Sequence, residues 1–346
     1  MVSKKNHVII LKNDAVGDLC QSLIAINNII ENNKDKKISI YLSERSKKFN
    51  FLINGKNLIF KVLNYNLTLL EKIKLIYLLF FTQISDIYIL TPKKFYYYLP
   101  YLFRNIKFHA ICIDGRKKYK RPNEYLRSFL YKFVINNRAA NYKRNHITNL
   151  LNQLTSNNNK NFKLEILANG SKFLKSQLPE NYIYFHIKKD IVDKLSWDLS
   201  KLNLLFNELL NYYDYIIFTK DIEKNKNSDL INKEFNVIDF RNENINIKND
   251  NSKIILFDNI EGEDLYYTIQ NSSKVLAFHG MMTNLGSIES NKVLDLWFCD
   301  IKNFDDYMNY RNAFYEFKPV YNGYDFTIPS KDISKTIRKI KYSLKK

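Results

Sequence analysis

The sequence predicts an α/β protein built from two doubly wound parallel-sheet domains that face a cleft. Short apolar runs alternate with stretches of helical periodicity, which is the pattern of strand and helix units that form a parallel sheet. This alternation begins again after an asparagine-rich segment in the middle of the chain. The length of 346 residues also suits two domains of ordinary size.

The apolar runs of the first half are expected to form buried strands, since parallel strands are covered by helices on both faces. They are Val8–Leu11, Ile38–Leu42, Ile59–Val62, Ile87–Leu90 and Ala110–Ile113. The first strand is followed by apolar residues at helical spacing, which predict a helix. They are Leu19, Leu23, Ile26 and Ile30. The polar stretch Asn152–Asn161 interrupts the pattern and is the predicted linker.

The second half repeats the same pattern. Its predicted strands are Tyr182–Ile187, Tyr215–Thr219, Asn236–Phe240, Ile254–Phe257, Val275–Phe278 and Val293–Trp297. Helical patterns lie between them at Leu199–Leu210 and Asp264–Gln270, and Ser330–Leu344 reads as an amphipathic helix with a basic face. We therefore expect an N-terminal domain over residues 1–155, a C-terminal domain over 165–329 and a basic amphipathic helix over 330–346.

The charge balance of the chain points to an anionic partner. Fifty-four Lys and Arg residues against 35 Asp and Glu give a net charge of +19, which suits nucleic acid, a membrane surface or a phosphorylated substrate. No stretch reaches the roughly 18 uninterrupted apolar residues of a spanning helix, and the N-terminal apolar run is too short for a signal peptide. The three cysteines lack close pairing, which indicates a reducing compartment and no zinc site. These features predict a cytoplasmic protein.

The first candidate site is the segment Lys12–Asp18, Lys-Asn-Asp-Ala-Val-Gly-Asp, between the first strand and its helix. In open α/β sheets ligands bind at the carboxyl edge of the strands, so Asp18 is well placed for chemistry there. The same residues have a structural interpretation, because Asp is a favoured helix N-cap and Gly a favoured turn residue. Both interpretations apply at once if the helix holds Asp18 while its carboxylate faces a substrate.

The second candidate site follows the predicted strand Val275–Phe278, where His279 and Gly280 lead into a probable helix. The start of a helix offers unpaired N–H groups and a positive dipole end, which suit a diphosphate, and Met281, Thr283 and Asn284 lie there.

The ends of two other strands of the second half are also expected at this edge. His186 and Lys188 follow one strand, with Lys194 further on. Thr219 and Lys220 close the next. Lysines at a sheet edge can neutralise a phosphate leaving group.

Several common motifs are absent from the sequence. It has no GxGxxG and no GxxxxGK[ST] loop, which removes the usual support for dinucleotide binding and NTP hydrolysis. It has no Asp-x-Asp, the usual metal clamp for a nucleotide diphosphate, and no GxSxG or CxxC.

These residues resemble glycosyltransferase family 9, the bacterial heptosyltransferase family. Its opening strand, Lys-Thr-Ser-Ser-Leu-Gly-Asp turn and helix are matched in register by this chain at Lys12, Gly17, Asp18, Ser22 and Ala25. His186, Lys194 and Trp197 match the start of its second half, without the family's Pro-Gly. In its donor motif, Asp-Ser-Gly-Pro-Met-His-Leu-Ala, this chain has His279 in place of the Asp and Asn284 in place of the His. The resemblance covers nearly the whole chain at low identity.

The resemblance implies the GT-B fold and an inverting, metal-independent glycosyltransferase. Asp18 would be the general base, with Lys12, Asn13 and Gly17 on the acceptor side. The donor side, which would hold the nucleotide sugar, would comprise His186, Lys188, Lys194, Thr219, Lys220, His279, Gly280, Met281, Thr283 and Asn284. No cofactor and no metal is expected, and nucleic acid is not expected as a partner. The implied acceptor is a lipopolysaccharide or other surface glycan, lipid-linked or phosphorylated.

A basic and apolar region of the first half suggests contact with an anionic membrane. Leu69, Ile73, Ile76 and Phe80 share one face of a predicted helix, and Arg104–Arg144 holds 12 Lys or Arg residues interleaved with Tyr and Phe. Such a combination suits an interfacial helix at the cytoplasmic face of the inner membrane, although a core helix beside a solvated loop fits equally.

Two other functions remain open from the sequence. One is a non-catalytic basic protein that binds nucleic acid. The other is a degenerate GT-B domain that binds an anionic glycan without transferring a sugar.

Overall fold

The computed structural model describes residues 6–114, 124–139, 144–155, 164, 166, 169–221, 235–240, 252–288, 293–320 and 323–344. The chain divides into two compact units. Unit 1 comprises Met1–Leu167 and Ile301–Lys318, and unit 2 comprises Ala168–Asp300 and Pro319–Lys346. The predicted linker over Asn152–Asn161 and the predicted basic region over Arg104–Arg144 lie partly outside the described residues.

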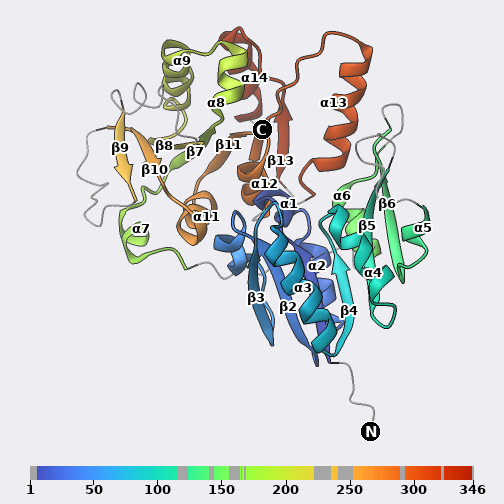
Figure 1. Cartoon of the computed structure of the whole chain (residues 1–346). Helices are drawn as coiled ribbons and strands as arrows, with labels where there is room; N and C mark the ends of the chain where they lie inside the picture. The colour runs from blue at the N-terminus through green and yellow to red at the C-terminus, as the bar shows by residue number, and fades with distance from the viewer. Residues whose placement is uncertain are drawn as a thin grey trace. The chain divides into compact units, whose positions relative to one another are not determined.

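Unit 1 is a doubly wound parallel sheet with helices on both faces (Figure 1). Its strands are β1 (His7–Lys12), β2 (Lys37–Ser43), β3 (Leu58–Leu63), β4 (Ile84–Ile89), β5 (Lys107–Asp114) and β6 (Lys132–Asn137). Its helices are α1 (Val16–Cys20), α2 (Leu23–Glu31), η1 (Lys47–Leu52), α3 (Leu69–Phe81), η2 (Lys94–Tyr98), α4 (Leu99–Leu102), α5 (Glu124–Arg127), α6 (Ile147–Gln153) and α13 (Phe304–Phe317). The order β3-β2-β1-β4-β5-β6 reverses direction between β1 and β4, so its ligand edge lies where these two strands end.

The two faces of the first sheet are covered by different helices. Leu75 and Leu79 of α3 share a buried core with strand residues such as Ile9 and Ile87, and this core extends to Leu99 of α4. Helices α2 and α6 contact each other, and the Asn28 amide of α2 donates to the Asn152 side chain at 2.6 Å.

Unit 2 repeats this architecture. Its strands are β7 (Tyr182–Ile187), β8 (Tyr215–Lys220), β9 (Asn236–Asp239), β10 (Ile254–Asp258), β11 (Lys274–Phe278), β12 (Val293–Leu296) and β13 (Tyr324–Thr327). Its helices are α7 (Lys172–Gln177), α8 (Lys189–Leu195), α9 (Leu199–Leu209), α11 (Gly262–Gln270), α12 (Met281–Ile288) and α14 (Ile333–Leu344). All its described strand pairs are parallel, and the order β13-β12-β11-β7-β8-β10-β9 reverses between β11 and β7.

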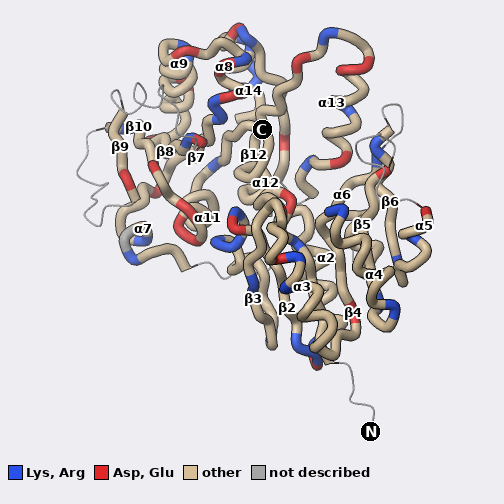
Figure 2. Tube along the Cα trace, viewed as in Figure 1, with Lys and Arg blue, Asp and Glu red and all other residues tan. Residues whose placement is uncertain are grey.

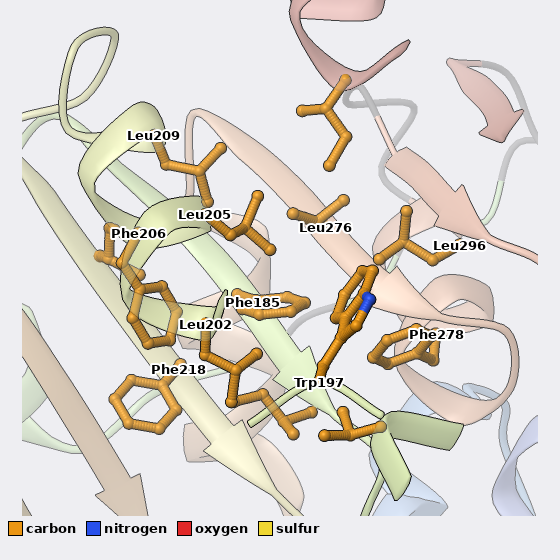
Figure 3. Packing of buried hydrophobic residues seen from close by; sticks show 14 of the residues in the cluster. Phe185, Trp197, Leu202, Leu205, Phe206, Leu209, Phe218, Leu276, Phe278 and Leu296 are labelled. Atoms are coloured by element: carbon orange, nitrogen blue, oxygen red, sulfur yellow. The ribbon is translucent and has the colours of Figure 1, made fainter. Parts of the chain in front are cut away.

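The core of unit 2 is aromatic where α8 and α9 meet the sheet. Figure 3 shows Leu202, Leu205 and Leu209 of α9 in the same cluster as Phe185 of β7. Trp197, between α8 and α9, packs 5.9 Å from the ring of Phe278 and donates from its indole N–H to the Ser330 carbonyl. Trp197 therefore fastens the chain segment that leads into α14.

The predicted doubly wound sheets are confirmed, and three elements differ from the prediction. Strands β6 and β13 are sheet-edge strands that lack a continuous apolar run, and β13 is partly exposed throughout. The third is α13, which the predicted boundaries place in the second domain but which packs with unit 1. Its buried Glu316 accepts from Asn136 at 2.8 Å, and the Gln21 amide donates to the Phe317 carbonyl.

The C-terminal stretch is helical, as the apolar spacing predicts. Ile333 and Ile340 of α14 are buried in the core of unit 2, and Lys341 pairs with Glu208 of α9 at 3.0 Å. Within the described helices of the chain, none combines the length and the apolar character that a membrane-crossing helix requires.

Candidate functional site

The end of β1 in unit 1 carries a buried ion pair. The Lys12 ammonium lies 2.8 Å from Asp14 Oδ2, and both side chains are almost fully buried. Thr91, which follows β4, donates its hydroxyl to the same oxygen at 2.9 Å. Asp14 therefore joins the two strands at which the sheet order reverses. The sequence singles out Lys12, whereas Asp14 looks there like an ordinary turn residue.

Asn13 lies inside the loop, and both the NH2 group and the oxygen of its side-chain amide form hydrogen bonds. It donates to the Asn64 carbonyl at 2.9 Å and accepts from the Tyr96 hydroxyl at 2.7 Å. Its side chain is fully buried. These contacts suit a residue that holds the loop better than one that contacts an acceptor.

Asp18 lies in the first turn of α1, three residues after the N-cap Ala15. It is therefore not the N-cap itself, as the structural interpretation of the sequence supposes, but its carboxylate accepts the backbone N–H of Ala15. Burial and the neighbouring Asp14 charge raise the pKa of Asp18, and the charges of Lys12 and Arg138 oppose this shift only in part. The residue keeps partial exposure. A partly exposed carboxylate with a raised pKa is typical of a proton acceptor in catalysis.

Gly17 does not serve the turn in the expected way. It lies within α1, and the glycines with positive φ in the described chain are Gly262, Gly280 and Gly323. The expected single helix is also interrupted, because α1 ends at Cys20 and α2 begins at Leu23. Ser22 occupies the break and donates its hydroxyl to the Asp18 carbonyl at 2.8 Å.

Arg138 connects the surroundings of Asp18 to helix α13. Its guanidinium Nε donates to Glu316 at 2.7 Å, and Arg144 binds the other carboxylate oxygen at 2.6 Å. Glu316 is completely buried. The sequence shows no local signal for this cluster, because Arg138 and Glu316 are 178 positions apart.

The corresponding edge of unit 2 centres on the turn between β11 and α12. Gly280 there has φ of +152°, a conformation that L residues rarely adopt. The Lys188 ammonium donates to the carbonyl of His279, and a Cβ atom on Gly280 would lie 2.4 Å from this ammonium. The backbone conformation thus requires glycine, and a Cβ would also displace the Lys188 ammonium, which comes from the end of β7.

His279 is held in one orientation by Asp295 and Trp297. Its Nδ1 lies 2.7 Å from Asp295 Oδ2, and Nδ1 is the donor because a carboxylate only accepts. The Tyr324 hydroxyl donates to the same carboxylate oxygen at 2.9 Å. The imidazole also packs on Trp297, with ring centroids 3.5 Å apart. Asp295 is fully buried within β12, and a charged residue inside a predicted apolar strand is the signal that could have identified it.

The polar side chains at the start of α12 turn inward. The Thr283 hydroxyl accepts from the Gly280 N–H at 3.1 Å, and the Asn284 amide donates to the Gly280 carbonyl at 2.8 Å. The Met282 sulfur accepts a hydrogen bond from the Tyr184 hydroxyl. Thr283 and Asn284 therefore shape the turn. Met281 is the first residue of α12 and is partly exposed.

His186 and Thr219 form a buried pair between β7 and β8. His186 Nδ1 lies 2.8 Å from the Thr219 hydroxyl, and Nε2 lies 3.4 Å from Asp221. Burial lowers the pKa of His186 despite the opposing effect of Asp221. Lys220, the last residue of β8, is partly exposed.

Lys194 forms its ion pair within its own helix. It lies near the end of α8, is largely exposed and pairs with Asp190 of the same helix at 3.6 Å. Lys188 is the lysine that contacts the β11–α12 turn. Among the described residues, no group of three or more His, Cys, Asp or Glu side chains is arranged to hold a metal ion.

No protein-family model matches the chain, and no curated protein matches its sequence. Solved structures do resemble it. The glycosyl transferase family 9 structure from Veillonella parvula has a TM-score of 0.66 at 11% identity, covering 99% of this chain and 90% of that one. Escherichia coli ADP-heptose LPS heptosyltransferase II has a TM-score of 0.66 at 10% identity, covering 98% of both chains.

A third similar structure belongs to another class of protein. UDP-GlcNAc 2-epimerase from Methanocaldococcus jannaschii has a TM-score of 0.57 at 15% identity, covering 99% of this chain and 93% of that one. At these identities the likeness concerns the fold. The two parallel-sheet units therefore have the heptosyltransferase-like, GT-B-type fold of glycosyltransferase family 9 structures.

Proposed function

We propose that this protein is an inverting glycosyltransferase that moves a sugar from a nucleotide sugar to a glycan acceptor, with Asp18 as general base. The observation that carries the proposal is the environment of Asp18. A carboxylate at the ligand edge of a doubly wound sheet keeps partial exposure, while burial and Asp14 raise its pKa. Such a group binds a proton more readily than an exposed carboxylate, as a base must during acceptor attack.

The proposed step balances as a single displacement. Asp18 takes the proton of an acceptor hydroxyl while that oxygen bonds to the anomeric carbon of the donor. The bond from this carbon to the diphosphate oxygen breaks, and the nucleoside diphosphate leaves with the electron pair. Attack from the face opposite the leaving group inverts the anomeric configuration. The proposal includes no metal, because the sequence lacks an Asp-x-Asp clamp.

Unit 2 is the proposed donor side. The diphosphate would lie at the β11–α12 turn, where the positive end of α12, Lys188 and the anchored His279 are close together. His279 donates through Nδ1 to Asp295, which leaves Nε2 to accept from a sugar hydroxyl or, when the imidazole is protonated, to donate to a phosphate oxygen. The similarity to an ADP-heptose transferase and a UDP-GlcNAc epimerase supports a nucleotide-sugar ligand.

Unit 1 is the proposed acceptor side, with Lys12, Asp14 and Thr91 as the framework around Asp18. The positive charge of the chain favours an anionic acceptor, and we propose a phosphorylated or lipid-linked glycan such as lipopolysaccharide.

The test begins with binding. Thermal unfolding is followed with ADP-, UDP-, GDP- and CMP-linked sugars, because a ligand that binds only the folded state raises the melting temperature. We expect one nucleotide class to stabilise the protein. That donor is then incubated with truncated surface glycans, and release of nucleoside diphosphate and the anomeric configuration of the product are measured.

The outcomes separate the candidate functions. Acceptor-dependent release with inversion supports the proposal, and retention of configuration contradicts it. A change of sugar configuration without an acceptor indicates an epimerase instead. No response to any nucleotide sugar, together with steep salt-dependent binding of RNA, would identify a nucleic-acid-binding protein. Binding of the donor or of an anionic glycan without turnover would identify a degenerate glycan-binding domain.

A further inference from the structure

Helix α3 exposes an apolar face to solvent. Ten of its 13 residues, Leu-Leu-Glu-Lys-Ile-Lys-Leu-Ile-Tyr-Leu-Leu-Phe-Phe, are aliphatic or aromatic, yet only Leu75 and Leu79 are buried. The exposed apolar residues are Leu69, Leu70, Ile73, Tyr77, Phe80 and Phe81. Leu69 is 72% exposed and Phe81 is 73% exposed. A helix that packs only on a core normally presents polar residues at such positions.

Aromatic contacts extend this surface onto α4 and α5. The Phe80 ring packs edge-on against Phe103, which follows α4, at 4.8 Å. Tyr101 of α4 packs on Phe129, which follows α5, at 5.3 Å. Leu102 and Tyr125 are also exposed. We define the apolar face as the exposed apolar residues of α3 together with Tyr101, Leu102 and Tyr125.

The charges around the apolar face are mainly positive. Residues 69–107 contain six Lys or Arg and two acidic residues, and Figure 2 shows α3 as mainly uncharged. Lys74, Lys94 and Lys107 are exposed. Arg104 stacks over the rings of Tyr101 and Phe129. Of the acidic residues, Glu71 is engaged in the capping box with Thr68, and Asp86 pairs with Lys36 and His109.

We propose that the apolar face binds the surface of an anionic lipid bilayer. Exposed aliphatic and aromatic side chains enter the interface between headgroups and acyl chains, while nearby lysines attract anionic headgroups. A helix of 13 residues spans about 20 Å, which is shorter than the hydrocarbon core, so α3 lies along the surface. A second copy of the chain is a poorer occupant, because each copy brings the same positive rim and a net charge of +19.

The burial of individual residues defines which side of α3 would contact the bilayer. Leu69, Ile73 and Phe80 of the predicted stripe are exposed, whereas Ile76 is only partly exposed and packs against the core.

The inference does not depend on the proposed sugar transfer, because vesicle binding is measured without a donor or acceptor.

The experiment is co-sedimentation of the full chain with vesicles of phosphatidylcholine alone or mixed with phosphatidylglycerol. We expect binding to the mixed vesicles that weakens as salt is raised. The triple variant Leu70→Gln, Ile73→Gln, Phe81→Gln should bind at least about tenfold more weakly, since three apolar side chains no longer enter the interface. Replacing Lys74, Lys94 and Lys107 by Gln should lower binding to the mixed vesicles by about fivefold per lysine.

The matched control is Leu204→Gln, Ile301→Gln, Phe304→Gln, which changes the same residue types at exposed positions of other segments. It should bind as the unmodified protein does, and both triple variants should keep the melting temperature. Equal binding by the α3 triple variant, or no binding of the unmodified protein to mixed vesicles, overturns the proposal. A concentration-dependent dimer in sedimentation velocity that disappears in the α3 variant would assign the face to a second copy and also overturn it.

Discussion

Replacement of Asp18 by Asn separates the catalytic interpretation from the structural one. The catalytic interpretation predicts a loss of turnover without a loss of stability, whereas the structural one predicts a loss of stability with turnover unchanged. Asn has nearly the same shape and can still accept the Ala15 N–H that Asp18 accepts. It cannot take a proton from an acceptor hydroxyl. Loss of a general base typically lowers the rate by about 10² to 10⁴, which corresponds to about 2.7 to 5.4 kcal/mol in the activation barrier.

The stability of the same variant should rise at neutral pH. The pKa of Asp18 is raised above 3.8 in the folded state, so the native state loses stability as the pH increases from about 3.8 through the raised pKa. A pKa that differs by one between the folded and unfolded states corresponds to about 1.4 kcal/mol. Asp18→Asn removes this unfavourable charge at pH 7. The gain should vanish below about pH 3.8, where Asp18 is protonated in both states.

Two assays measure these effects. Initial rates of nucleoside diphosphate release give turnover, and urea unfolding at neutral and acidic pH gives the free energy of unfolding. Asp35→Asn, an exposed position of the same unit, is the neutral control. Asp14→Asn should instead destabilise by about 3 kcal/mol, because it leaves the Lys12 ammonium buried without a counter-charge. Near-normal turnover of Asp18→Asn would refute the assignment of the base. Lower stability at pH 7 would refute the burial argument.

Two further predictions concern unit 2. Gly280→Ala should weaken nucleotide-sugar binding and lower the free energy of unfolding by about 1 to 3 kcal/mol, since the backbone there is strained for an L residue and a Cβ would meet the Lys188 ammonium. Calorimetry measures the binding and thermal unfolding the stability, and the control Gly17→Ala, in helical backbone, should not destabilise. Burial lowers the pKa of His186 below 6.5 in the native state. The neutral imidazole therefore contributes stability above pH 6.5, and this contribution is lost as the pH falls from 6.5 towards the lowered pKa. Unfolding free energies should therefore decline below about pH 6.5, at up to about 1.4 kcal/mol per pH unit for this group; a decline that persists unchanged in His186→Gln would contradict this source.

The sequence predicts every central strand of both sheets, and these strands are covered on both faces; it also predicts the partly buried edge strands β3 and β9. Strands covered on both faces need mainly apolar residues, and β7 and β1 are buried along their whole length. The edge strand β13 needs no such run, and its residues Tyr-Asp-Phe-Thr resemble a loop. Helix α13 is not predicted to pack with the first unit, because chain order gives no sign of it.

The candidate site divides in a similar way. Asp18, His279 and Gly280 are predictable because each lies shortly after an apolar run, and chain position alone places such residues at a sheet edge. The residues that hold the loops in place come from elsewhere in the chain. Thr91 is 77 positions from Asp14, and Glu316 is 178 positions from Arg138. Contacts at such separations depend on the strand order, which local pattern does not determine.

The two units share a feature that the sequence of neither candidate site reveals. In each, a buried carboxylate uses one oxygen to hold a basic group at the end of a strand beside the reversal of the sheet: Asp14 holds Lys12 of β1, and Asp295 of β12 holds His279, which follows β11. In the described part of the chain, the second oxygen of each carboxylate is buried without a hydrogen-bond partner. Such an oxygen costs about 1 to 3 kcal/mol, so each carboxylate stabilises the fold less than a fully hydrogen-bonded one would. Their presence is explained if the orientation of a basic group at each ligand edge matters more to the protein than the stability lost.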